Sequence, residues 1–222
     1  MEKLLIILQT KDFCVVYKPF SMLSVPSRFA GADPRPVAGL ALQTMLNQQI
    51  WPCHRLDEDV SGILLFALTD QAHKAANGWF ESRNVIKTYH ALTAQSENIL
   101  TEGTIFEWHT KLAKGKKRAY EADFGKPSHT TATYLKTDTS KAAERWILTP
   151  HTGRSHQLRF DMFKHGRPIL GDSLYGSKQT FDRGGIALRS TELDFTKCDV
   201  KNLQIPIRIT LPNELLLWDI QK

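Results

Sequence analysis

The stretch that most constrains the fold is residues 54–67, HRLDEDVSGILLFA, in which a charged, turn-like half precedes a short apolar run. Residues 63–67 contain no polar side chain, which is typical of a strand buried on both faces. Asp57 lies in the charged half, just before the N-terminal end of this strand. A carboxylate in such a place is held still by the scaffold, and burial can tune its pKa. The stretch therefore predicts a buried strand with a candidate catalytic carboxylate in front of it.

The same stretch resembles the HRLDxxTSGLLLxA signature of the RluA family of pseudouridine synthases, with Val60 where threonine is usual. About a hundred residues further on, residues 152–159 (TGRSHQLR) resemble the family's TGRxHQxR, and residues 166–176 resemble its GxPIxGDxxYG. Two long motifs in this order and spacing are hard to obtain by chance. The resemblance covers roughly residues 10–196. The sequence of residues 22–28, MLSVPSR, is similar to that of a short family member with both tRNA and rRNA substrates.

The resemblance implies a reaction and three catalytic residues. Pseudouridylation breaks the bond between ribose and N1 of uracil, turns the base and rejoins it through C5, so no cofactor is expected. Asp57 would supply the ionised carboxylate that forms or stabilises a covalent intermediate, by attack on either the base or the sugar. Arg159 would pair with Asp57 through two hydrogen bonds, which lysine could not copy. Tyr89 would lie against the uracil once it is flipped out of the RNA.

The resemblance also implies contacts to RNA around the reacting base. Arg55 would fill the space that the flipped base leaves, and His54 would orient the RNA or its own loop. Arg154, His156 and Gln157 are open to two interpretations, RNA contact or internal hydrogen bonding. We therefore treat these five residues as candidate RNA-binding residues.

A basic segment, residues 111–118, is expected to be a loop and contains Lys116, Lys117 and Arg118. It is either a solvated turn, as most charge runs are, or a clamp for RNA phosphates. Two further positions depart from the family pattern: Asp161 stands where histidine is frequent, and Arg189 replaces a histidine. We expect both at the RNA-facing periphery, so they bear on the substrate more than on the reaction.

Composition narrows the class of protein. The chain has 222 residues with 29 Lys+Arg against 23 Asp+Glu, a net charge of +6, which favours polyanionic partners such as RNA. Its three cysteines are scattered and no HExxH motif occurs, so neither a disulfide framework nor a metal site is expected. No apolar run is long enough for a signal core or a membrane span. We expect a cytoplasmic monomer that binds structured RNA and no membrane.

The periodicity elsewhere predicts one α+β domain. Helices are expected over residues 37–49, about 69–83 with Thr69 or Asp70 as the cap, and 155–165. Strands are expected at residues 4–8, 13–17, 85–93, 130–137, 145–149, 186–188, 193–195 and 205–209. Pairing by hairpins gives a mixed, mainly antiparallel sheet flanked by helices, in agreement with the pseudouridine synthase fold that the resemblance implies.

The expected organisation is a single catalytic domain over residues 1–222, without the S4-type RNA-binding domain of longer relatives. Recognition by that domain alone suits a compact stem-loop, whose loop bases can be read directly. The resemblance implies an anticodon-loop uridine of tRNA, a loop uridine of 23S rRNA, or both, with another tRNA or rRNA site as the alternative.

Two other classes of protein are open to test. A non-catalytic RNA-binding or RNA-folding protein could share the fold, but Asp57, Tyr89 and Arg159 are all in place. A serine hydrolase is suggested only by Ser155 and His156. Adjacent side chains point apart and no GxSxG motif is present, which argues against the hydrolase.

Overall fold

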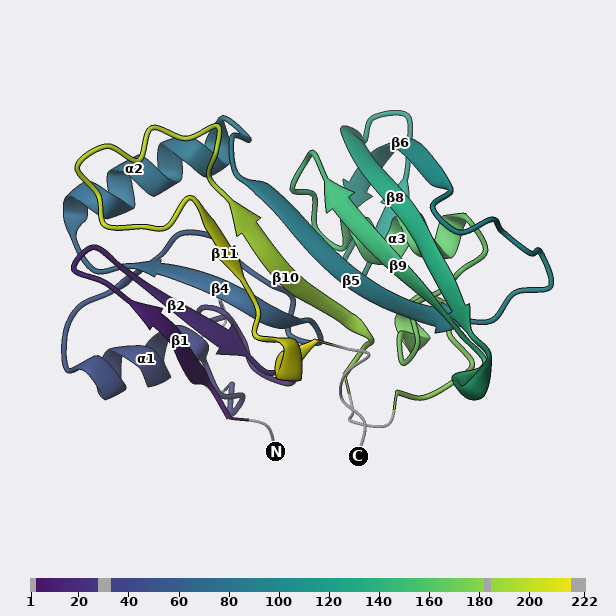
Figure 1. Cartoon of the computed structure of the whole chain (residues 1–222), viewed down its shortest axis with the longest axis horizontal. Coiled ribbons are helices and arrows are strands. Elements are labelled where there is room, and N and C mark those ends of the chain that lie inside the picture. Colours follow the sequence, from purple (N-terminus) through teal and green to yellow (C-terminus); the bar gives the residue numbers. More distant parts are fainter. Residues whose placement is uncertain (1–2, 28–32, 182–184, 217–222) are drawn as a thin grey trace. The chain divides into compact units, whose positions relative to one another are not determined.

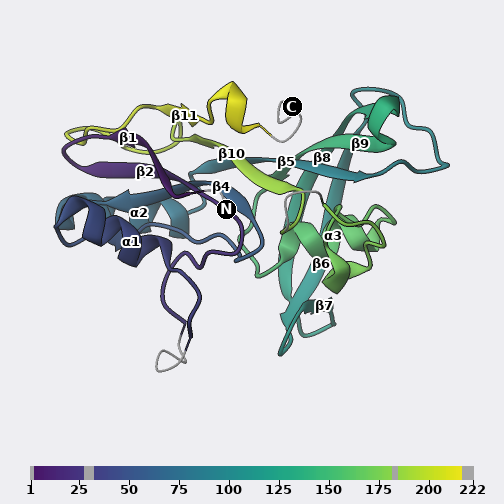
Figure 2. The ribbon, with the colours of Figure 1, turned by 90° about the horizontal axis from the view of Figure 1, so that it is seen from below.

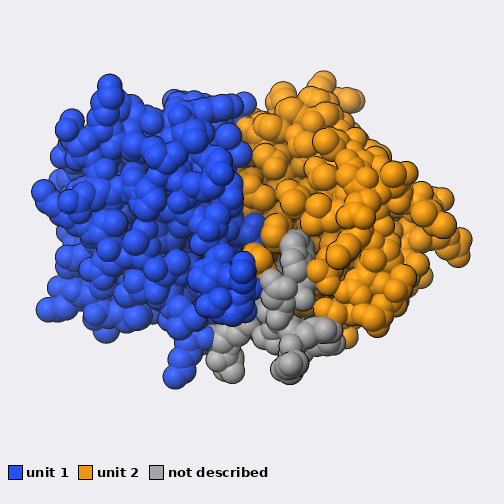
Figure 3. Space-filling view, in the orientation of Figure 1, with its two compact units in different colours: residues 1–86, 190–215 blue, residues 87–189, 216–222 orange. Residues whose placement is uncertain are grey.

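The computed structural model describes residues 3–27, 33–181 and 185–216. The chain forms two compact units, unit 1 with residues 1–86 and 190–215 and unit 2 with residues 87–189 and 216–222 (Figure 3). Two of the three boundaries fall inside strands, β5 (Ile86–Ala94) and β10 (Leu188–Asp194). The single catalytic domain expected from the sequence stays a prediction.

Unit 1 is built on a sheet in the order β1-β2-β4-β10 (Figure 1), in which β1 and β2, and β2 and β4, pair antiparallel. The ranges of its other strands are β1 (Leu5–Gln9), β2 (Phe13–Lys18), β3 (Trp51–Pro52), β4 (Ser61–Ala67) and β11 (Arg208–Thr210). Strand β3 pairs with β4, and β11 pairs with β10. Every residue of β2 and β4 is buried, which confirms the buried strand predicted from the apolar run.

The helices of unit 1, α1 (Ala38–Leu46) and α2 (Asp70–Glu81), lie on the same side of β1, β2 and β4 (Figure 2). Thr69 caps α2 as predicted, because its hydroxyl accepts a hydrogen bond from the Ala72 amide at 3.2 Å. The buried Trp79 ring of α2 lies 5.9 Å from the Phe13 ring of β2. Of the helices in the described residues, none has the length and apolar character needed to cross a membrane.

Unit 2 contains an antiparallel sheet in the order β5-β9-β8-β6-β7. Its remaining strands are β6 (Ile105–Lys114), β7 (Ala119–Glu121), β8 (Lys126–Asp138) and β9 (Ala143–Pro150). Helix α3 (Gln157–Lys164) contacts four of these strands, β6 to β9. Short 3-10 helices occur at Thr139–Lys141, Ser173–Tyr175 and, in unit 1, Asn213–Leu215. The predicted mainly antiparallel α+β fold is confirmed.

Three local predictions need correction. Strand β6 was missed at residues 105–110, because outward-facing polar residues interrupt its short row of buried ones. The segment 111–118 is only half loop: Lys111–Lys114 pair with β7 and β8, and the turn itself is residues 115–118. The strands expected at residues 186–188 and 193–195 are replaced by the single strand β10, whose last three residues pair with β11.

Candidate active site

The loop that carries Asp57 is anchored by its backbone within unit 1. Ser24 binds both backbone polar groups of Leu56, the residue before Asp57. The Ser24 hydroxyl donates to the Leu56 carbonyl at 2.8 Å and accepts from the Leu56 amide at 2.9 Å. The Asp57 carbonyl accepts from the Val60 amide at 3.2 Å, which closes a tight turn. Asp57 itself is half-buried, while Leu56 and Val60 are buried on either side of it. The carboxylate is therefore presented on an ordered loop.

Lys18 fixes the other end of this turn. Its ammonium is completely buried and donates to the carbonyls of Pro19 (2.8 Å), Met22 (2.7 Å) and Glu58 (3.2 Å). Burial lowers the pKa of Lys18 to about 8, although the carboxylates of Asp57, Asp59 and Glu58 act in the opposite direction. No role was predicted for Lys18, although a lysine followed by proline at a strand end was an available signal.

The two residues before Leu56 have different surroundings. The His54 ring is stacked on Phe80 with centroids 4.9 Å apart, and its Nε2 accepts from the Leu65 amide at 3.2 Å. His54 therefore ties the loop to β4 and α2, which is one of its two expected roles. Arg55 is exposed, as a residue that contacts RNA must be.

Gly62 explains why the motif needs glycine directly after the loop. Its φ of 119° is a conformation that side-chain-bearing residues rarely adopt, and a Cβ atom there would overlap the backbone of Ser190. The backbones of β4 and β10 therefore approach each other closely at the start of β4.

In unit 2, Tyr89 is a buried residue of β5, 8% exposed, opposite Leu148 of β9. Arg159 lies in the first turn of α3 and is 3% exposed. Its Nε and Nη2 atoms donate to the two carboxylate oxygens of Asp172, at 2.7 and 2.8 Å. Asp172 thus ties its loop to α3 by a bidentate ion pair. The expected pairing of Arg159 with Asp57 stays a prediction, since Asp57 belongs to the other unit.

Tyr175 joins the two motifs of unit 2, and the sequence did not single it out. The Arg159 guanidinium lies 5.4 Å from the centre of its ring. Its hydroxyl accepts from the Ala119 amide at 2.7 Å and lies 3.2 Å from His156 Nδ1. His156 has a left-handed backbone (φ 53°), a strained conformation for a residue with a side chain. A tyrosine in the GDxxYG motif was the signal for this contact.

The remaining residues of the second motif differ in exposure. Gln157 is buried. Its side-chain oxygen accepts hydrogen bonds from the Thr152 hydroxyl and the Arg154 amide, and its side-chain nitrogen donates to the His129 carbonyl and the Thr130 hydroxyl of β8. Of the two interpretations left open for Gln157, the structure therefore supports internal hydrogen bonding. Arg154 is partly exposed, with its Nε donating to the Pro127 carbonyl at 3.0 Å.

The two departures from the family pattern are both buried, so their expected place at the RNA-facing periphery is wrong. Asp161 is 1% exposed and accepts a hydrogen bond from the Thr130 hydroxyl at 2.7 Å. Burial raises the pKa of Asp161 to about 6. Arg189 is also 1% exposed. The apolar neighbours Phe160 and Met162 of Asp161, and Leu188 before Arg189, could have indicated burial.

The turn between β6 and β7 carries Lys116, Lys117 and Arg118, all exposed. Beside this hairpin lies a groove of about 390 Å³, and its lining includes Lys114, Lys126, Arg154 and the aromatic ring of Phe124. Phe124 is 80% exposed, which is unusual for a large apolar side chain. Cations next to an exposed aromatic ring are the combination that binds single-stranded nucleic acid, through phosphates and stacked bases.

Unit 1 thus offers a carboxylate on an anchored loop, and unit 2 offers a buried arginine and a cationic, aromatic groove. These features define an enzyme of the α+β class with a surface suited to RNA. A family model described as "RNA pseudouridylate synthase" matches residues 12–165. The chain belongs to the RluA family of RNA pseudouridine synthases. It is accordingly an isomerase whose substrate is RNA.

Individual relatives agree with this assignment. The chain is 33% identical to the dual-specificity RNA pseudouridine synthase RluA of Yersinia pestis, over 78% of this chain and 82% of the relative. It is 28% identical to an uncharacterized RNA pseudouridine synthase of Haemophilus influenzae, over 96% and 89% of the two chains. The structure of human RNA Pseudouridylate Synthase Domain Containing 1 has the same fold, with a TM-score of 0.75 at 24% identity, over 97% of this chain and 85% of the other.

Proposed function

We propose that this enzyme isomerises a uridine in a compact RNA stem-loop, namely uridine 32 of the tRNA anticodon loop, uridine 746 of 23S rRNA, or both. The observation that carries this proposal is the 33% identity to a dual-specificity synthase over most of both chains. The groove between the β6–β7 hairpin and Arg154 supports it, because a loop base and its phosphates need an aromatic face and nearby cations. Another tRNA or rRNA uridine is the alternative.

In the proposed reaction Asp57 is the catalytic carboxylate. The bond between C1′ and N1 breaks, the uracil turns, a bond forms between C1′ and C5, and the proton from C5 is lost while N1 gains one. Asp57 attacks the base or the sugar and is released again, so atoms and electrons balance without a cofactor. Its anchoring by Ser24 and Lys18 supports this role, because a nucleophile must be held in a reactive geometry.

Arg159 and Tyr89 are proposed to act on the same uridine. The Arg159 guanidinium would keep Asp57 ionised. Asp172 accepts from Nε and Nη2, on the side of the guanidinium, and the proposed two-bond contact to Asp57 would use its end-on face, formed by Nη1 and Nη2. Tyr89 would stack on the flipped uracil and assist proton transfer.

RNA contacts are proposed for Arg55, Arg154 and His156, together with Lys116, Lys117 and Arg118 of the turn. Arg55 would occupy the space left by the flipped base, and the turn would bind phosphates. We place the reaction in the cytoplasm, with the chain acting as a monomer. Free cysteines at positions 14, 53 and 198 suit that compartment.

The proposal is tested by mapping pseudouridine in tRNA and 23S rRNA from cells that lack the gene. Carbodiimide treatment and primer extension would reveal one missing stop, and expression of the unmodified protein should restore it. Expression of Asp57→Asn should not restore it, although the variant keeps the shape of the side chain. A missing stop at a different uridine selects the alternative site. If no stop is lost in either RNA, the dual-substrate proposal is wrong and other RNAs become the candidates.

A separate assay with purified protein distinguishes an enzyme from an RNA-binding relative. Arg159→Lys should bind a stem-loop substrate nearly as well as the unmodified protein and form product far more slowly, because a lysine cannot hold two partners in the guanidinium plane. Near-normal turnover of Arg159→Lys would restrict Arg159 to a structural role. Stem-loop binding without turnover by the unmodified protein would support the non-catalytic alternative.

A further inference from the structure

The outer face of the unit 2 sheet carries a cluster of metal-ligating side chains, one of which, His151, directly precedes the motif of residues 152–159. Strands β6 and β8 alternate between buried and more exposed residues, and the exposed face includes Glu107, His109, His129 and Thr131. The register places His109 opposite His129 and Glu107 opposite Thr131. His151, directly after β9, donates its amide to the His129 carbonyl at 2.9 Å. Cross-strand pairing therefore gathers residues whose spacing along the chain does not indicate a site.

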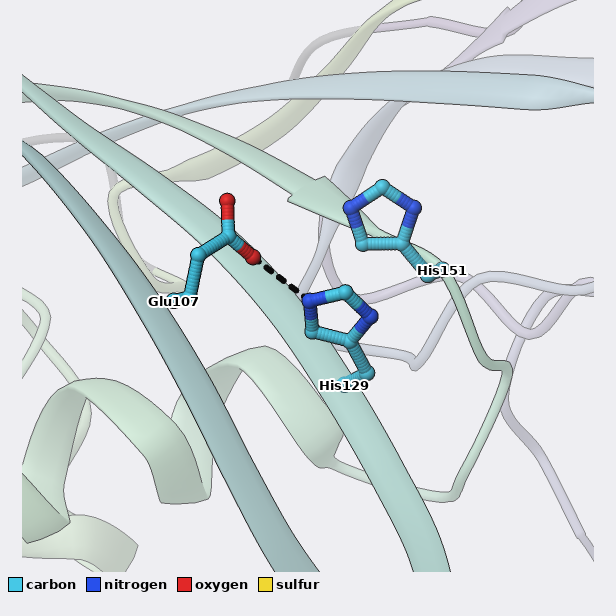
Figure 4. Close-up of side chains that lie close together, drawn as sticks. All are labelled: Glu107, His129 and His151. Atoms are coloured by element: carbon cyan, nitrogen blue, oxygen red, sulfur yellow. Dashed lines mark hydrogen bonds and ion pairs between the residues drawn. The ribbon is translucent and has the colours of Figure 1, made fainter.

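The side chains converge on one point (Figure 4). Glu107 Oε2 lies 2.5 Å from His129 Nε2, and one ligand atom from each of Glu107, His129 and His151 lies within 4.8 Å of the others. The Thr131 hydroxyl donates to Glu107 at 2.9 Å and lies 2.7 Å from His151 Nε2. Thr131 thereby holds two of the three groups in place from within the sheet.

We propose that Glu107, His129 and His151 form a binding site for a divalent transition metal ion of the zinc class. Two imidazoles and a carboxylate suit zinc, nickel or copper, whereas calcium and magnesium prefer sites made of oxygen atoms. Tetrahedral zinc with bonds of about 2.0–2.1 Å needs its ligand atoms about 3.3–3.4 Å apart. Rotation of these solvent-accessible side chains would bring His151 closer and widen the 2.5 Å contact between Glu107 and His129. Water completes the coordination, since three protein ligands leave one position open.

The alternative for these residues is a surface ion pair between Glu107 and His129. Such a pair needs neither His151 nor the bridging Thr131 hydroxyl, and exposed pairs contribute only about 0–1 kcal/mol. The flanking rings also restrict His129, which stacks on both His109 and His151 with centroids 4.2 Å apart. Three donors of the right type, held on a rigid sheet by a bridging hydroxyl, favour the metal site.

A bound metal would act on the segment that leads into α3. His151 precedes Thr152, whose hydroxyl accepts from the His129 amide at 3.0 Å and donates to Gln157 at 2.7 Å. The metal therefore ties β6, β8 and the end of β9 together at the start of residues 152–159. This function is independent of the uridine that the enzyme selects.

Metal binding is tested on the full chain after treatment with a chelator, by titration with zinc and by the visible spectrum of the cobalt complex. We expect one zinc ion per chain. His129→Asn should weaken zinc binding by about a hundredfold or more, and Thr131→Val by about tenfold, as loss of a supporting hydrogen bond does at metal sites. Zinc should also slow amide exchange in residues 128–131 and 149–153.

Two control variants separate this site from incidental zinc binding. His73→Gln removes a partly exposed histidine in unit 1, and Cys198→Ser removes the cysteine that is not buried. Both should bind zinc as tightly as the unmodified chain. No zinc uptake by the unmodified chain, unchanged affinity in a folded His129→Asn variant, or loss of binding in Cys198→Ser would each overturn the proposal.

Discussion

Arg159 and Asp172 form a bidentate ion pair in the interior of unit 2, with the two side chains only 3% and 1% exposed. The pair joins the first turn of α3 to the loop of the motif at residues 166–176. Tyr175 of the same loop adds its ring to the guanidinium face. The orientation of Arg159 is therefore set by its own unit.

Asp172→Asn should unfold more easily than the unmodified protein, by about 3–5 kcal/mol in the free energy of unfolding, because it leaves a buried guanidinium without its counter-charge. Urea denaturation measures this difference. Lys164→Gln is the matched control on α3, since Lys164 pairs with Glu121 at the surface and its loss should cost less than about 1 kcal/mol. Equal losses of stability in the two variants would mean that the buried ion pair contributes no more to the free energy of unfolding than the surface ion pair does.

Lys18→Met should lower product formation by at least about tenfold while leaving affinity for RNA nearly unchanged. Methionine fills a similar volume but cannot bind the carbonyls of Pro19, Met22 and Glu58, so the turn that presents Asp57 loses an anchor. Single-turnover kinetics and RNA binding should be measured together. Lys11→Met, at an exposed position in the same unit, should leave both unchanged. Normal turnover in Lys18→Met would remove Lys18 from the positioning role.

The raised pKa of the buried Asp161 carboxyl predicts that the stability of the protein depends on pH. Its pKa is raised by burial from 3.8 to about 6, so the folded state prefers the protonated carboxyl. The stability from this preference is fully present below about pH 4 and is lost as pH rises through about 6. Relative to Asp161→Asn, the unmodified protein should therefore lose about 2–3 kcal/mol between pH 4 and pH 7, from the size of the shift. A difference between the two proteins that stays constant over this range would contradict the raised pKa.

Gly62→Ala should be strongly destabilising, by about 3 kcal/mol or more, because its Cβ would overlap the Ser190 backbone and its φ is unfavourable for alanine. Gly78→Ala is the opposite case in α2, where a Cβ meets nothing within 4 Å. That control should stabilise the protein by about 1 kcal/mol through helix propensity. Thermal unfolding of both variants tests the contrast, and a mild effect of Gly62→Ala would show that β4 and β10 can separate.

The sequence predicted those elements whose periodicity reflects local packing. Helix α2 has both a cap, Thr69, and a clear apolar stripe, and β4 has an uninterrupted apolar run, so both were located closely. Strand β6 was missed because charged and polar residues on its outer face hide a buried row of Trp108, Thr110 and Leu112.

The residues of the candidate site were likewise predicted only in part. Residues that belong to motifs, such as Asp57 and Arg159, were identified through the resemblance. Contacts between distant segments carry no local signal, and the Lys18 bond to Glu58, the Tyr175 contact with Ala119 and the outer-face histidines are of this kind. They depend on strand register and on how loops close, which become known only once the chain is folded.

The central claim is that the carboxylate of Asp57 catalyses exchange of the C1′–N1 bond for a C1′–C5 bond. Release of tritium from C5 of uridine tests it directly, because each turnover transfers that hydrogen to water. Tritium-labelled stem-loop RNA would be incubated with the purified unmodified protein and with Asp57→Asn, after equal RNA binding has been checked. We predict stoichiometric release by the unmodified protein and none above background by Asp57→Asn. Comparable release by Asp57→Asn, with RNA affinity retained, would contradict the assignment of Asp57.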